Sequence, residues 1–158
     1  MPEIADAAQW RTATAECAAG LRAMILRHPW MASTLGQVGL SYLGPNVMRM
    51  TDRMVGLFIT GGFTAEEAGD AIGVLVGYVV GVGISEAAWL TMLTRTGQTE
   101  RELMDGLRPA AEQAAQEFPH LKSDIATENW DQDPSKARDR KFAYGLDRVL
   151  DGLNLRRN

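Results

Sequence analysis

Apolar side chains recur every three or four residues through most of the chain, which is the spacing of one face of an α-helix. Glycine and proline interrupt the pattern at several places, and no convincing strand appears. The pattern therefore predicts an all-α protein. Helices are expected over residues 6–28, 47–59, 64–96, 100–117 and 134–156, with a short element over 30–35, a glycine-rich loop over 36–44 and a charged connector over 122–132.

Several helix ends are marked by specific residues. Two Thr-x-x-Glu sequences, at 64–67 and 99–102, have the spacing of a capping box. Asp6 is the expected N-cap of the first helix, and Asp133–Pro134 supplies an N-cap and a first-turn proline for the last one. Pro109 predicts a break or a restart within its helix.

One side of the predicted helix over residues 64–96 carries a small residue at every fourth position. Each glycine costs about 0.5 to 1 kcal/mol relative to alanine inside a helix, so the row indicates a ridge against which another backbone packs closely. The opposite side is apolar apart from Glu86, so the helix is expected to face its own core on one side and a partner chain on the other. The small residues are Gly69, Gly73, Gly77, Gly81 and Ser85.

This double-sided helix predicts a homodimer. The last helix adds an apolar face, with two glycines seven residues apart. The predicted interface contains Gly73, Gly77, Gly81, Leu146, Val149 and Leu153.

A membrane span is the alternative interpretation of the same helix, because rows of small residues also pack transmembrane helices. Asp70 and Glu86 enclose a charge-free run at residues 71–85, which is shorter than the roughly 20 residues needed to cross a bilayer. No secretory signal precedes it, and the single Cys17 offers no internal disulfide. We therefore expect a cytoplasmic protein that does not associate with a membrane.

Composition and charge narrow the function further. The 158 residues, of which 46% are hydrophobic and 23% charged, fit one soluble globular domain. The net charge of -4 and the scattered basic residues predict that this chain alone does not bind nucleic acid. His28 and His120 lie beside prolines, and the carboxylates have simpler roles as caps or surface charges. We expect no catalysis, no cofactor and no metal site.

Six short segments follow one another in a fixed order. They are residues 27–30 (Arg-His-Pro-Trp), 43–46 (Leu-Gly-Pro-Asn), 62–68 (Gly-Phe-Thr-Ala-Glu-Glu-Ala), 77–87 (from Gly-Tyr to Glu-Ala), 118–121 (Phe-Pro-His-Leu) and 142–153 (Phe-Ala-Tyr-Gly-Leu-Asp-Arg-Val-Leu-Asp-Gly-Leu). In this order and spacing, which cover nearly the whole chain, they resemble the C-terminal domain of TetR-family transcriptional regulators. The last segment is the most specific.

The resemblance implies a bundle of about six helices that dimerises through a four-helix bundle and holds a small-molecule effector. Residues 64–93 and 134–156 match the bundle helices. The helix-turn-helix head with which family regulators begin, and through which they bind operator DNA, has no counterpart here. The chain is then either the regulatory domain of a longer regulator, which we favour, or a headless homologue that senses without touching DNA.

The resemblance also places an effector pocket among the first four predicted elements. Thioether and aromatic side chains there can repack around hydrophobic ligands of different shape, so we expect an elongated or multi-ring hydrophobic effector. The predicted pocket residues are Met24, Met31, Met48, Met54, Phe58, Val82, Glu86 and Trp89.

Glu86 either binds a polar or cationic group of the ligand or reaches solvent at the rim of this pocket. In tetracycline-binding relatives a carboxylate helps to hold a magnesium ion, and its position falls on Ser85 here, so we expect binding without a metal. A dimerisation module whose core holds no cavity is the alternative function.

Overall fold

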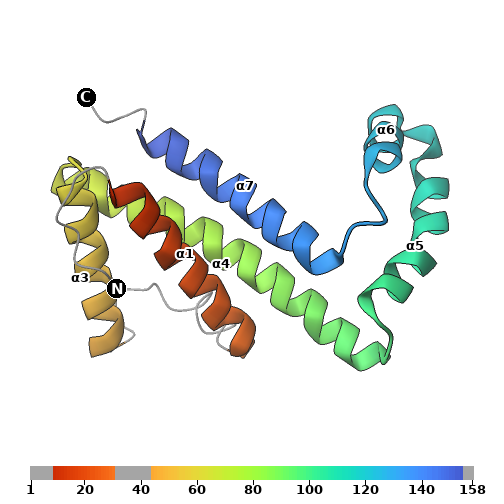
Figure 1. Ribbon diagram of the computed structural model, residues 1–158, viewed down its shortest axis with the longest axis horizontal. Helices are drawn as coiled ribbons and strands as arrows, with labels where there is room; N and C mark the ends of the chain where they lie inside the picture. Colours follow the sequence, from red (N-terminus) through yellow and green to blue (C-terminus); the bar gives the residue numbers. More distant parts are fainter. Residues whose placement is uncertain (1–8, 31–43, 155–158) are drawn as a thin grey trace. The chain divides into compact units, whose positions relative to one another are not determined.

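The computed structural model describes residues 9–30 and 44–154, which are helical apart from turns and short connections (Figure 1). This confirms the predicted all-α fold. The helices are α1 (Trp10–Arg27), α3 (Pro45–Thr60), α4 (Ala65–Thr96), α5 (Glu100–Ala114), α6 (Pro119–Thr127) and α7 (Pro134–Asn154), with a 3-10 turn, η3 (Ala115–Glu117), between α5 and α6. The expected cap at Asp6 and most of the predicted element over 30–35 lie outside the described residues, as does the predicted loop up to residue 43.

The chain divides into two compact units. The first contains the described residues up to Ala88 together with those from Phe142 onward, and the second runs from Trp89 to Lys141. Helices α4 and α7 contribute to both units.

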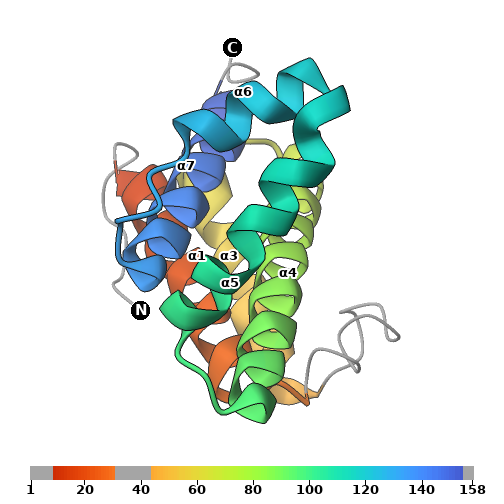
Figure 2. The same cartoon turned by 90° about the vertical axis from the view of Figure 1, so that its right-hand side faces the viewer.

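The first unit is built around an apolar core. Within it α1 and α7 lie along α4 (Figures 1 and 2). Phe58 of α3 packs with Trp10 and Phe63 in an aromatic cluster whose ring centroids are 5.1 to 5.9 Å apart. Edge-to-face and tilted packing of this kind adds to the free energy gained by burial.

Two glycines allow close packing inside this unit. A side chain at Gly83 of α4 would come within 3.0 Å of Ile25, so the missing Cβ lets α1 approach α4. At Gly145 of α7, the ring of Tyr78 occupies the space that a Cβ would need. Gly145 is one of the two glycines seven residues apart in the last predicted helix, and it allows close packing within its own chain.

The second unit contains α5, η3 and α6 with the end of α4 and the start of α7. Thr99 and Glu102 form the predicted capping box at the start of α5. The expected break at Pro109 is wrong, because α5 continues through this residue to Ala114. The loss of one helical hydrogen bond at a proline is tolerated here within a helix that is otherwise regular and firmly capped.

The predicted connector over residues 122–132 is wrong up to residue 127, since α6 occupies Pro119–Thr127, whereas residues 128–132 do connect α6 to α7. Pro119 lies in the first turn of α6, where a proline is compatible with a helix. Leu121 and Ile125, four residues apart, were the apolar signal in a segment dominated by charge.

Helix α4 is long and apolar enough to span a membrane by length and composition, with a mean hydropathy of 1.8 in its most apolar window, of which 39% is buried. One helix of this kind does not overturn the expectation from the sequence that the chain does not associate with a membrane. The core helix of a soluble protein meets the same criteria.

Candidate functional site

The structure places the predicted pocket residues in different surroundings. Met54 and Phe58 belong to the core of the first unit, where they are 5% and 1% exposed. Met24 and Val82 are half-buried, whereas Met48 is 56% exposed. Trp89 lies in the second unit, and Met31 lies outside the described residues. The side chain of Met48 is thus not buried by the rest of the described chain.

Glu86 forms a two-pronged ion pair with Arg22 of α1. Its carboxylate oxygens accept hydrogen bonds of 2.7 Å from Nε and 2.8 Å from an Nη atom of Arg22. The side chains are only 7% and 12% exposed. The expectation that Glu86 reaches solvent at a pocket rim is wrong, because its carboxylate is buried and held by a partner charge. Its role in binding a polar or cationic group of a ligand stays a prediction.

The ion pair lies where three helices meet. The Arg22 guanidinium carbon is 4.8 Å from the centroid of the Phe142 ring, so Arg22 of α1 joins Glu86 of α4 to an aromatic side chain of α7. A cation over an aromatic face is attracted by the ring quadrupole. Arg22 was not predicted from the sequence, although a lone acid on an apolar helix face is itself a signal that a cation lies opposite.

Tyr78 makes a second link between α4 and α7. Its hydroxyl donates a 2.8 Å hydrogen bond to the carbonyl oxygen of Phe142, and the two rings stack with centroids 5.8 Å apart. Burial raises the pKa of Tyr78 above its ordinary value. The contacts of Tyr78 and Arg22 with Phe142 fix α7 against α4 within the first unit.

The predicted dimer interface falls into two groups. Gly73, Gly77 and Gly81 are exposed, and beyond its own stretch of helix backbone a side chain added at any of them would meet none of the described residues within 4 Å. Leu146, by contrast, is 6% exposed and belongs to the core of its own chain, with Val149 and Leu153 half-buried against that core.

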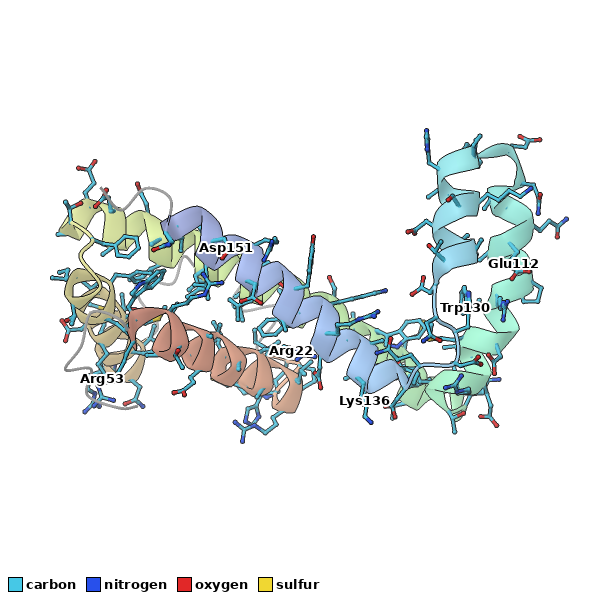
Figure 3. The ribbon with its side chains drawn as sticks, turned by 45° about the horizontal axis from the view of Figure 1, so that its top comes forward. Arg22, Arg53, Glu112, Trp130, Lys136 and Asp151 are labelled. Atoms are coloured by element: carbon cyan, nitrogen blue, oxygen red, sulfur yellow. The ribbon has the colours of Figure 1, made fainter. Side chains whose placement is uncertain are left out.

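The second unit contains a cavity of about 240 Å³. The Trp89 indole N–H donates a 2.6 Å hydrogen bond to Glu100, which is also paired with Arg138. Trp130 follows α6 and faces α5 (Figure 3). The lining residues are Trp89, Glu100, Arg101, Met104, Asp105, Glu128, Asn129, Trp130, Gln132, Pro134, Ala137, Arg138 and Lys141.

Arg101 closes one wall of this cavity. Its guanidinium donates hydrogen bonds to the backbone carbonyls of Trp130, Asp131 and Gln132, at 2.7, 3.0 and 3.2 Å. These bonds hold the segment between α6 and α7 against α5. The cavity was not predicted from the sequence, because its lining comes from α4, α5, the α6–α7 segment and α7.

Within the part of the chain that the structure describes, no three His, Cys, Asp or Glu side chains gather as potential metal ligands. The thiol of Cys17 is half-buried, and burial raises its pKa above the ordinary value.

Comparisons with known proteins agree on one family. A family model described as "Tetracyclin repressor-like, C-terminal domain" matches residues 2–157. The HTH-type transcriptional repressor DrrR1 from Streptomyces coeruleorubidus is 31% identical over 150 residues, which cover 92% of this chain and 52% of DrrR1. The structure of the TetR family protein ActR from Streptomyces coelicolor, in complex with actinorhodin, matches 98% of this chain and 67% of ActR with a TM-score of 0.69 and 25% identity. This chain thus spans about half the length of the curated relative.

Proposed function

The chain belongs to the tetracyclin repressor-like C-terminal domain family, and on that premise we propose that it is the effector-sensing and dimerising part of a TetR-like transcriptional repressor. Such a regulator works in the cytoplasm. Its operator DNA would be bound by the helix-turn-helix head of a full-length regulator. The net charge of -4 supports the view that this chain alone does not bind DNA.

The exposed glycine ridge of α4 is the single observation that carries this proposal. It consists of Gly69, Gly73, Gly77 and Gly81, none of which has another segment packed against it among the described residues. Four glycines inside one helix cost about 2 to 4 kcal/mol relative to alanine, and nothing in the described chain offsets that cost. A second copy packed with its α4 on this ridge would do so, with α7 completing a four-helix bundle.

Substitution of Gly77 by leucine tests the dimer. The larger side chain would wedge the two α4 helices apart, so sedimentation should shift from dimer to monomer. Gly56→Leu is the matched control, because Gly56 is also an exposed helical glycine with open space around it, but lies on α3. A Gly77→Leu protein that sediments as a dimer of unchanged stability would place the interface elsewhere.

The effector is proposed to bind without a metal among the predicted pocket residues of the first unit, where Met24 and Val82 are half-buried. Two observations support this. The structurally similar ActR is in complex with actinorhodin, and the Arg22–Glu86 pair offers polar groups in otherwise apolar surroundings. A ligand would have to displace part of the packed core or enter beside the ion pair.

A dimerisation module without a ligand is the second candidate, and the dense packing of Met54 and Phe58 favours it. A thermal-shift screen with hydrophobic multi-ring compounds separates the two functions. A ligand at 100 times its Kd adds about 2.7 kcal/mol of stability if it binds only the folded state.

For any compound found in this way, Met24→Ala should weaken binding, whereas Met92→Ala, at an exposed methionine of α4, should leave it unchanged. Chelator should have no effect. If no compound raises the melting temperature, the dimerisation module is the better description.

A further inference from the structure

The cavity of the second unit has an uneven pattern of charge pairing. Its lining includes three acids and three bases, so formal charges cancel overall. Glu100 is paired with Arg138, and Glu128 accepts a 3.2 Å hydrogen bond from Lys141. The Arg101 guanidinium donates hydrogen bonds to three backbone carbonyls.

Asp105 is the exception. It lines the cavity from α5, and within the part of the chain that the structure describes, its carboxylate has neither a hydrogen-bond nor an ion-pair partner. The neighbouring Arg108, three residues further along the helix, pairs with Glu112 at 2.7 Å and is thereby drawn away from Asp105. Among the charged side chains of the lining, the one without a partner among the described residues is therefore an anion.

The apolar part of the lining is aromatic and thioether surface from Trp89, Trp130 and Met104. The ring of Trp130 already attracts one cation, since the Arg108 guanidinium carbon lies 5.3 Å from its centroid. Indole faces bind cations more strongly than other aromatic side chains do. An unpaired carboxylate beside two indoles suits a flat molecule that carries a positive charge.

We propose that this cavity is a small-molecule site of the second unit, separate from the effector pocket proposed in the first unit, and that it takes a flat aromatic cation. Asp105 provides the counter-charge, while Trp89 and Trp130 provide apolar contact and cation–π attraction. The volume of about 240 Å³ suits a ligand of two fused rings.

N-methylquinolinium is the test probe, and quinoline, which is uncharged at neutral pH, is its matched analogue. Titration of the full chain is followed by the indole N–H resonances in two-dimensional NMR spectra. The resonances of Trp89 and Trp130 should move, while those of Trp10 and Trp30, in the first unit, serve as internal controls. The cation should bind about tenfold more tightly than quinoline.

Asp105→Asn should bring the two affinities within about twofold of each other, because it removes the charge and keeps the shape. Asp124→Asn, at an exposed carboxylate of α6 outside the cavity, is the control and should retain the preference. Both sites are exposed, so the variants should fold; unchanged circular dichroism checks this.

Equal affinity for the two probes would overturn the proposal, as would an equal loss in Asp124→Asn or shifts at Trp10 instead of Trp89 and Trp130. Absence of binding by either probe would also overturn it. So would tighter binding of quinoline-2-carboxylate, because that result would make Arg101 rather than Asp105 the deciding charge.

Discussion

The two units differ in how far their side chains are buried. The first unit has a core whose most buried side chains, such as Phe58, Ile25 and Leu150, are at most 1% exposed. In the second unit, no residue of α5 or α6 is buried. The second unit relies instead on polar contacts, such as those of Arg101 with three carbonyls and of Glu100 with Trp89 and Arg138. Apolar burial gives a few kcal/mol for each large side chain, while a typical hydrogen bond adds about 1 kcal/mol net. Substitutions of the same kind should therefore have very different effects in the two units.

The largest effect is expected from Phe58→Ala. Removal of a ring that is 1% exposed creates a cavity within the aromatic cluster and should lower the free energy of unfolding by about 4 kcal/mol. Phe118→Ala is the control in the second unit, because Phe118 is 56% exposed and should cost less than about 1 kcal/mol. Urea unfolding measures both. Similar losses for the two variants would show that the units do not differ in this way.

Arg22→Met should have the next largest effect. It leaves Glu86 buried without its partner charge, and the loss should be about 3 kcal/mol. Arg11→Met breaks the pairs of Arg11 with Asp147 and Asp151, which are exposed, and should cost at most about 1 kcal/mol.

The double variant Arg22→Met, Glu86→Gln should recover part of the loss, since no uncompensated charge remains. If Arg22→Met proves as mild as Arg11→Met in urea unfolding, burial of the Arg22–Glu86 pair does not determine its contribution.

Thr14→Val should have the smallest effect and the opposite sign. The Thr14 hydroxyl is buried in the first unit and has no hydrogen-bond partner among the described residues. A valine of the same shape removes this unpaired polar group and should stabilise the protein by about 1 kcal/mol.

Thr94→Val is the comparison for this change, because the Thr94 hydroxyl is exposed and donates to the Leu90 carbonyl at 2.9 Å. Its effect on the melting temperature should be close to zero. Destabilisation by Thr14→Val would indicate that the hydroxyl has a partner after all, such as an ordered water.

Local signals predicted most of the fold from the sequence. The Thr64–Glu67 box was identified by spacing alone, and it forms with bonds of 2.8 to 3.2 Å. The capping box at the start of α5 and the end of α4 before Gly97 are also confirmed. The resemblance to the TetR family is confirmed by the family match over residues 2–157.

Contacts between distant segments were not predictable in the same way. Arg22 and Glu86 are 64 residues apart, and helical spacing says which face a side chain occupies but not which residue lies opposite. The cavity of the second unit is lined by residues of α4, α5, the segment between α6 and α7, and α7, which helical spacing alone does not bring together. The predicted interface and pocket residues remain predictions, because they depend on a second chain and a ligand.

The Arg22–Glu86 pair also restricts how α1 can move along α4. Apolar surfaces can slide past each other by small amounts at little cost, but a displacement of one helical turn, about 5.4 Å, would separate the two charges and leave both buried. Intermediate positions are therefore unfavourable, and the two helices have one preferred axial alignment. A molecule that pushes between them would produce an abrupt change of alignment rather than a gradual one.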